Sequence, residues 1–279
     1  MKLYAINAGY FKLDGGAMFG VVPKTIWQKL NPPDANNLCT WAMRCLLIED
    51  GKKLILIDCG LGNKQSEKFF SYYEPHGDDS IEKNLNKHGF SCNDVTDVIL
   101  THLHFDHCGG AIIRNGDKLV PAFPNATYWS NEKHWEWATH PNPREKASFL
   151  PENILPIQDS GQLKFTGEDS RDIHPNIYLK TVSGHTESML IPHIEYRNKT
   201  VIYCADLFPS MAHIPVPYVM AYDTRPLLTL EEKQLFLQRG LVENHIFFFE
   251  HDNATECCTL KQTERGVRED ATFKLEELQ

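Results

Sequence analysis

Four potential metal ligands fall within six consecutive residues, His102-Leu103-His104-Phe105-Asp106-His107. The apolar residues 98–100 directly before them predict a buried strand, because continuous apolar runs are typical of strands covered on both faces. Side chains two apart on a strand point the same way, so the first two histidines are expected to converge on one ion. The aspartate and the third histidine lie past the strand end, where a turning backbone can aim them at a second ion. Since every buried polar group needs a partner, this spacing predicts a metal site rather than core packing.

Composition and charge narrow the class of protein. The chain has 279 residues, 42% of them hydrophobic and 23% charged, which is ordinary for a globular protein, and we expect one domain over residues 1–279. No signal peptide or membrane-spanning segment is evident, and the eight cysteines include no CxxC pair, so a reduced, cytoplasmic protein is expected. A net charge of −9 without a basic run argues against nucleic acid. The expected partner is a small-molecule substrate, with no nucleic acid and no membrane, bound by a monomer or homodimer.

Apolar runs separated by turn signals predict a two-sheet core flanked by helices, an α+β fold. Asp50-Gly51 predicts the turn of a hairpin over residues 43–58. Ser80 predicts the start of a helix over residues 80–88, and Thr229-Leu230-Glu231-Glu232 has the form of a capping box that opens a second helix. Residues 121–160 predict an irregular or helical insertion. Further strands are predicted at residues 177–182, 189–191, 200–204 and 246–249.

Three more potential ligands follow predicted strands. His185 comes after the strand that ends at Val182, Asp206 follows the strand over 200–204, and His251 follows the strand over 246–249. Ligands collected at one edge of a sheet are a common way for several strands to build one site. Two ions a few ångströms apart repel each other, so a bridging carboxylate helps to hold them, and Asp206 suits that role.

This set of residues resembles the metallo-β-lactamase-fold hydrolase superfamily, and the similarity extends to Ile57-Asp58-Cys59-Gly60. The resemblance implies a four-layer αββα sandwich, with two mixed β-sheets flanked by helices. It also implies two metal ions and their ligands. The first ion would be held by His102, His104 and His185, the second by Asp106, His107 and His251, with Asp206 bridging both.

Within that superfamily, two stretches are similar to the N-acyl-homoserine-lactone lactonase branch: residues 101–110 and residues 123–129. The chain departs from that branch in two places. A tyrosine that helps to orient the substrate is typical shortly after the bridging aspartate, but residues 207–210 read Leu-Phe-Pro-Ser. The usual Gly-His-Thr-x-Gly-His becomes Gly-His-Thr-Glu-Ser-Met at residues 184–189, without its second histidine, which is not a ligand in the family.

The proposed ligands are imidazoles and carboxylates with no thiolate, which favours Zn²⁺ and also suits Mn²⁺, Fe or Co. The hypothesis is hydrolysis of an ester-like bond, with a lactone as the leading substrate: a hydroxide bridging the ions attacks the carbonyl, and Asp106 acts as the proton shuttle. Rival enzymes are a phosphotriesterase or arylesterase, a thioesterase and a β-lactamase. A metal-binding sensor without catalysis and an iron redox protein are the alternatives from other classes.

Two further expectations concern the surroundings of the site. The insertion over residues 121–160 and the loop over residues 207–228 are expected to line the pocket, along with the aromatic N-terminal stretch around Met18. Asp58 has two open interpretations: a partner that holds a ligand histidine in one tautomer, or an aspartate that caps its own loop beside Gly60.

Overall fold

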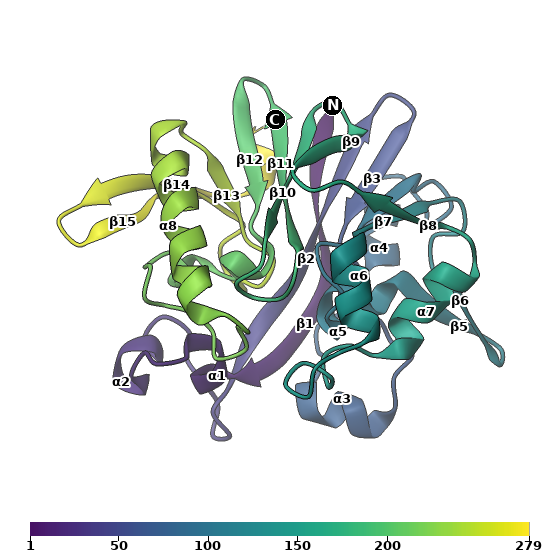
Figure 1. The fold of residues 1–279 in the computed structure, drawn as a ribbon, viewed down its shortest axis with the longest axis horizontal. Coiled ribbons are helices and arrows are strands. Elements are labelled where there is room, and N and C mark those ends of the chain that lie inside the picture. The colour runs from purple at the N-terminus through teal and green to yellow at the C-terminus, as the bar shows by residue number, and fades with distance from the viewer. Residues whose placement is uncertain (279) are drawn as a thin grey trace.

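Two mixed β-sheets pack face to face in the computed structural model of the chain, which describes residues 1–278 (Figure 1). The first sheet is antiparallel from β1 to β3 and parallel from β3 to β8. Its strands, in spatial order, are β1 (Lys2–Asp14), β2 (Leu38–Asp50), β3 (Lys53–Ile57), β4 (Asp97–Ile99), β7 (Thr127–Asn131) and β8 (Leu163–Thr166).

The second sheet is antiparallel except where β12 and β13 run parallel. Its strands, in spatial order, are β15 (Gly266–Phe273), β14 (Cys257–Thr263), β13 (Ile246–Phe248), β12 (Lys199–Tyr203), β11 (Met189–Tyr196), β10 (Ile177–Val182) and β9 (Ser170–His174). A separate hairpin is formed by β5 (Ile112–Asn115) and β6 (Lys118–Pro121).

Helices cover the outer face of each sheet. Apolar residues of the first sheet form one cluster with α4 (Ile81–Lys87), α6 (Glu132–Thr139) and α7 (Pro151–Asp159). On the second sheet, α8 (Pro226–Val242) packs through Phe236 and Leu237. The facing sides of the two sheets form the central apolar core between these layers. This helix, sheet, sheet, helix order confirms the predicted four-layer α+β fold.

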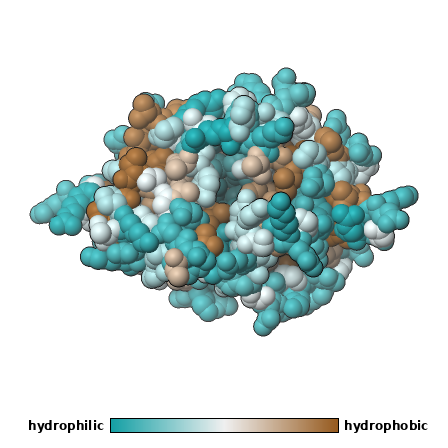
Figure 2. All heavy atoms as spheres, turned by 90° about the horizontal axis from the view of Figure 1, so that it is seen from below, coloured by the Kyte–Doolittle hydropathy of each residue, from teal (hydrophilic) through white to brown (hydrophobic). Residues whose placement is uncertain are grey.

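Shorter helices lie near the ends of the strands. They are α1 (Gly15–Phe19), α2 (Lys24–Trp27), α3 (Glu67–Tyr73) and α5 (Phe105–Cys108). The face that carries α1, α2 and α3 is mostly hydrophilic, with apolar side chains gathered in separate patches (Figure 2). Among residues 1–278, no helix combines the length and the apolar character needed to cross a membrane.

Several predicted elements are confirmed. The hairpin of β2 and β3 closes where Asp50 pairs with Lys53. At the start of α4, the Ser80 hydroxyl accepts a hydrogen bond from the backbone N–H of Lys83 at 3.2 Å, as an N-cap does. The strands predicted around residues 177–182, 189–191, 200–204 and 246–249 are β10 to β13, with ends that differ by a few residues.

Two expectations are wrong in part. The stretch predicted as an irregular or helical insertion contains α6 and α7, but also β7, which pairs in parallel with β4 inside the first sheet. Pro124 and Asn125 just before β7, and Asn131 as its last residue, obscured this short strand. The predicted capping box is not one, because α8 already begins at Pro226. The Glu232 carboxylate instead accepts the backbone N–H groups of Ser183 and Gly184, at 2.7 and 3.0 Å.

A buried histidine predicts how stability changes with pH. His193 on β11 is 6% exposed, and burial lowers its pKa to about 4. Because the unfolded chain takes up this proton near pH 6.5, stability is full above that pH and is lost as the pH falls toward 4. Between pH 7.5 and 5, the free energy of unfolding should therefore fall by about 2 kcal/mol less in His193→Leu than in the wild type. Urea unfolding at both pH values measures this difference. An unchanged pH dependence would contradict this account.

Candidate metal centre

The histidine-rich segment lies beyond a strand rather than on it. β4 ends at Ile99, the chain bends at Thr101 and runs without regular structure to His104, which directly precedes the single turn of α5. His102 and His104 do converge, as predicted, but the expected reason, alternation along a strand, is wrong. Asp106 and His107 sit within α5, and their side chains belong to one group of close potential ligands, with Oδ2 of Asp106 3.8 Å from Nε2 of His107.

The backbone of this segment is held against the loop after β3. The Cys59 N–H donates to the carbonyl of His107 at 2.7 Å, and the Gly110 N–H donates to the carbonyl of Gly60 at 2.8 Å. The two chains approach so closely that a Cβ atom on Gly109 would lie 2.1 Å from the Leu61 carbonyl oxygen. Glycine is therefore required after the last histidine, because any side chain would push the ligands out of place.

The other three residues come from turns at the same end of the sheets. His185 lies between β10 and β11, Asp206 lies in a short 3-10 turn after β12, and His251 lies three residues after β13. Ala205, just before the aspartate, has a positive φ of 41°, a strained conformation for a residue with a side chain. The structure thus brings all seven predicted residues together at one edge of the two sheets.

The first cluster contains three histidines and one oxygen of Asp206. Nδ1 of His104 lies 3.1 Å from Nε2 of His102 and 3.2 Å from Nε2 of His185. Oδ2 of Asp206 lies 3.1 Å from Nε2 of His185 and 3.8 Å from Nε2 of His102. These four side chains are grouped closely enough to bind one ion.

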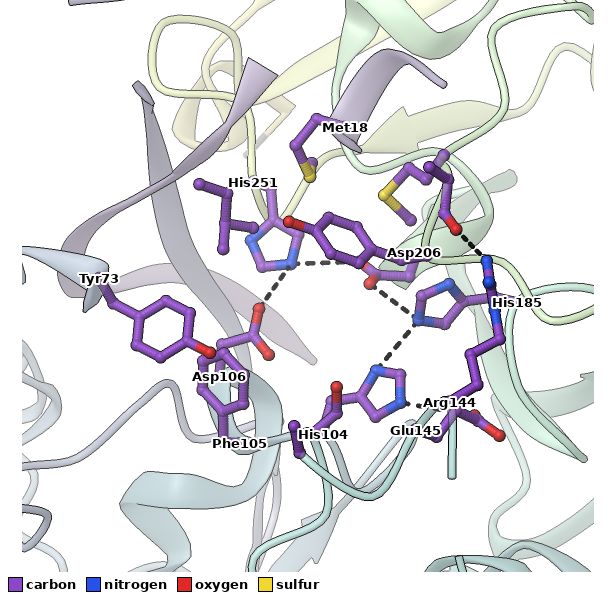
Figure 3. Close-up of a pocket in the computed structure, with 16 residues that line it drawn as sticks. Met18, Tyr73, His104, Phe105, Asp106, Arg144, Glu145, His185, Asp206 and His251 are labelled. Carbon is purple, nitrogen blue, oxygen red and sulfur yellow. Dashed lines mark hydrogen bonds and ion pairs between the residues drawn. The ribbon is translucent and has the colours of Figure 1, made fainter. Parts of the chain in front are cut away.

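The second cluster contains Asp106, His107 and His251. Nε2 of His107 and Nε2 of His251 are 3.1 Å apart, and Oδ2 of Asp106 lies 3.8 and 3.7 Å from them. The remaining oxygen of Asp206, Oδ1, is 3.1 Å from Nε2 of His251 and 3.5 Å from Nε2 of His107. Asp206 therefore presents one oxygen to each cluster, and Figure 3 shows it between His185 and His251.

Most of the rings are oriented by a hydrogen bond on their outer nitrogen. Nδ1 of His185 lies 2.8 Å from the Asp223 carboxylate, and Nδ1 of His251 lies 2.8 Å from the Ala42 carbonyl. Nδ1 of His107 lies 3.1 Å from the Asp58 carboxylate. A neutral imidazole has one N–H, and these acceptors place it on the outer nitrogen, which leaves the inner nitrogen with a lone pair.

These inner lone pairs fit a metal centre. On this assignment Nε2 of His107 and Nε2 of His251, which lie 3.1 Å apart, both present lone pairs, and Oδ1 of Asp206 has no hydrogen-bond partner although it is buried. Electron pairs this close repel each other unless a cation lies among them. The donors are nitrogen and oxygen only, so Zn²⁺, Mn²⁺, Fe or Co would each suit the set.

The pKa values of His185, His251 and Asp206 show that positive charge is stabilised beside Asp206. Burial lowers the pKa of His185, but the charges of Asp206 and Asp223 outweigh it and raise that pKa to about 10. Burial also opposes protonation of His251, whose pKa Asp206 raises to about 9. The pKa of Asp206 is well below its usual value, because the histidine charges outweigh its burial. The groups around Asp206 therefore favour positive charge, whereas burial lowers the pKa values of His102 and His104 and keeps these two rings neutral.

Asp58 contacts a candidate ligand, His107, which agrees with the first of its two interpretations. Its Oδ1 accepts the Thr101 N–H at 2.8 Å and its Oδ2 accepts the Thr101 hydroxyl at 2.7 Å, besides facing Nδ1 of His107. Such outer partners fix the tautomer of a ligating imidazole.

Three other carboxylates beside the site were missed by the sequence analysis: Glu145, Asp223 and Glu250. Glu145 accepts the Thr186 hydroxyl at 2.6 Å and the indole N–H of Trp137 at 2.7 Å, and it lies 3.7 Å from Nε2 of His104. Burial raises its pKa, but His104 and Thr186 outweigh this and lower the pKa to about 2. No spacing along the chain relates these carboxylates to the ligands they face.

A cavity of about 300 Å³ opens onto both clusters. His104, Asp106, His185, Asp206 and His251 form its base (Figure 3). Its walls come from separate parts of the chain: Leu13 and Met18, Tyr73, Phe105, residues 144, 145, 147 and 148, and residues 220–222. Within the insertion over residues 121–160, the aromatic stretch from Trp129 to Trp137 does not line the cavity. A mainly apolar cavity over polar groups is typical of a site for a small molecule.

Comparison with known families agrees with this geometry. A family model described as the metallo-beta-lactamase superfamily matches residues 44–251, which include the whole candidate metal centre. The chain belongs to the metallo-β-lactamase superfamily. Membership in this superfamily, together with the lactonase relatives described next, identifies it as a metal-dependent hydrolase.

Relatives of this superfamily member include N-acyl homoserine lactonases. One from Bacillus thuringiensis is 26% identical over 264 residues, covering 90% of this chain and 93% of the relative. Another, from Bacillus cereus, is 28% identical over 264 residues, which again cover 90% of this chain and 93% of the relative.

Solved structures extend the comparison. A probable metal-dependent hydrolase from Staphylococcus aureus superposes with a TM-score of 0.89 at 28% identity, covering 98% of this chain and 96% of the other. An N-acyl homoserine lactone hydrolase with N-hexanoyl-L-homoserine bound at its catalytic metal centre has a TM-score of 0.70 at 25% identity, covering 90% and 93%. The same fold is found in a dizinc quorum-quenching lactonase. It superposes with a TM-score of 0.79 at 22% identity, covering 98% of this chain and 95% of the other.

Proposed function

We propose that this superfamily member is a dinuclear metal-dependent lactonase, which opens the ring of a small lactone of the N-acyl-homoserine-lactone type. The observation that carries the proposal is Asp206, whose two oxygens face two separate groups of ligands at the base of one cavity. The lactonase relatives, each matched over most of the chain, support the choice of substrate. A single unit over residues 1–279 would supply all ligands and all walls of the pocket.

In this proposal His102, His104 and His185 hold one ion, Asp106, His107 and His251 hold the other, and Asp206 binds both. When bound, divalent ions supply Lewis-acid polarisation of a carbonyl and a water molecule of lowered pKa. The Asp106 carboxylate lines the cavity, so it is placed to take a proton and to deliver it to the leaving alkoxide. The apolar walls exclude water and hold the acyl chain.

Two tyrosines of the cavity lining, Tyr73 and Tyr222, are candidates for the role of the tyrosine that the chain lacks after Asp206. Tyr73 and Tyr222 both line the cavity, and neither hydroxyl has a hydrogen-bond partner among residues 1–278. Burial, the neighbouring Tyr73 and the charge of Asp106 raise the pKa of Tyr222, so its hydroxyl stays protonated and can donate. We infer that Tyr222 donates a hydrogen bond to the substrate carbonyl oxygen.

Replacing Tyr222 with phenylalanine should lower kcat/KM for lactones by about 10²-fold, the usual cost of removing one donor from a developing oxyanion. Metal content and thermal stability should stay as in the wild type, since the hydroxyl has no partner in the protein. Tyr72→Phe is the matched control, because Tyr72 is 60% exposed and lies outside the cavity lining. Equal activity of both variants would exclude Tyr222 from substrate binding.

A substrate panel tests the proposed function itself. Purified protein of known metal content would be assayed with homoserine lactones of several chain lengths, an aryl ester, a phosphotriester, a thioester and a cephalosporin. We expect the highest kcat/KM with a homoserine lactone, loss of turnover on chelation, and recovery when metal is added. A higher kcat/KM with another class would overturn the lactone assignment, and tightly held metal without any turnover would favour a sensor.

A further inference from the structure

Glu250 is a buried carboxylate directly behind the second cluster. It precedes His251 in the chain, but its side chain turns toward His107, and Oε2 lies 3.0 Å from Nδ1 of that ring. The side chain is 0% exposed. Asp58 approaches the same nitrogen, with Oδ2 at 3.1 Å. Two carboxylates from different sheets thus flank one ring nitrogen of a candidate ligand.

The two carboxylates differ in their hydrogen bonds. Asp58 accepts two hydrogen bonds from Thr101, and the single N–H of His107 is directed at it. Since one N–H cannot point at both acceptors, Glu250 is left without a hydrogen bond on either oxygen, despite the short distance to His107. Burying a carboxylate without donors carries a large free-energy cost unless positive charge lies nearby.

The polar groups around Glu250 do not supply that charge. The hydroxyl of Tyr203 has one hydrogen, which it donates to the carbonyl of Arg44 at 3.2 Å. The guanidinium of Arg44 donates to the carbonyls of Phe249 and Thr255 at 2.7 and 3.3 Å. With His107 and His251 neutral, as ligands of a metal must be, the nearest source of positive charge for Glu250 is an ion on the far side of the His107 ring.

We propose that Glu250 is a positioning residue that retains the ion of the second cluster, acting through His107 as a countercharge. A negative charge behind an imidazole makes its opposite nitrogen a stronger electron-pair donor, and the ion in turn offsets the burial of the carboxylate. Asp58 orients the ring, whereas Glu250 contributes charge. This inference rests on the proposed dinuclear site, which it extends by assigning a residue outside the ligand set.

Glu250→Gln tests the charge, because glutamine keeps the shape of the side chain. With metal-loaded protein titrated against a chelator, we expect the affinity for one of the two ions to fall by about 10- to 100-fold. The other ion should be affected less. Asp223→Asn is the matched variant behind His185, and it should weaken the other ion first. Metal content per chain after dialysis is the readout, with Co²⁺ spectra to tell the two clusters apart.

Glu250→Asp keeps the charge but moves it away from His107. Glu250→Asp should retain two ions. It should release the ion of the second cluster at a chelator concentration between the one that strips this ion from Glu250→Gln and the one that strips it from the wild type. If Glu250→Gln does not fold, Glu250→Asp decides alone, and release identical to the wild type overturns the proposal. If the wild type itself binds no second ion, the proposed dinuclear site fails. Two ions held equally well by the wild type and Glu250→Gln overturn only the role of Glu250.

Discussion

Asp206→Asn is expected to abolish turnover and to lower the metal content together. The asparagine side chain keeps the shape but carries no charge, so the repulsion between two neighbouring cations is no longer offset by a shared carboxylate. Both clusters should lose a proposed ligand at once, because Oδ2 faces the first and Oδ1 faces the second. We expect kcat/KM to fall by roughly 10³-fold or more, as when a group that acts within a unit is removed.

Asp97→Asn controls for the loss of any buried carboxylate. Asp97 is 1% exposed and pairs with Lys53 at 2.7 Å in the first sheet, outside the cavity lining. This variant should lose some stability, seen in its melting temperature, while it keeps the metal content and kcat/KM of the wild type. Full activity in Asp206→Asn, or an equal loss of metal in both variants, would refute the bridging role.

Asp106→Asn should have the second largest effect, because Asp106 is proposed to move the proton besides binding an ion. General acid–base groups contribute about 10²- to 10⁴-fold to rates, so kcat should fall within that range. The loss should depend on the leaving group. A thiolactone or an aryl ester releases an anion that needs little protonation, and its turnover should fall much less than that of an oxygen lactone.

The comparison between leaving groups separates the two roles of Asp106. If Asp106 served only as a ligand, its replacement would slow both kinds of substrate by the same factor. Metal content of the variant, measured on the same samples, corrects for any loss of the second ion. Equal losses for oxygen lactones and thiolactones, at equal metal content, would rule out the proton shuttle.

The sequence predicts those parts of the fold that carry a strong local pattern. The hairpin of β2 and β3 and the core strands β10 to β13 have apolar runs bounded by turn residues. By contrast, β1 is an edge strand whose register shifts between Asn7 and Tyr10, which breaks its alternation. β14 and β15 form a largely polar hairpin at the edge of the second sheet, so they lack a burial signal.

The candidate ligands could be predicted because each follows a strand, and strand ends meet at the edge of a sheet. Their outer partners could not, since those contacts depend on distances between segments far apart in the chain. Asp223 meets His185 from the loop before α8, and Glu145 meets His104 from the segment between α6 and α7. Glu250 is adjacent to a ligand in the chain, yet it faces a different ligand.

Metal analysis of the purified protein tests the central claim most directly. Elemental analysis after extensive dialysis should give two transition-metal ions per chain in the wild type and at most one in Asp206→Asn. Supply of Zn²⁺, Mn²⁺, Fe or Co to the metal-free chain should restore the same stoichiometry. A wild-type protein without stoichiometric metal, which also takes up none of these ions, would contradict the account of a dinuclear centre at this edge of the fold.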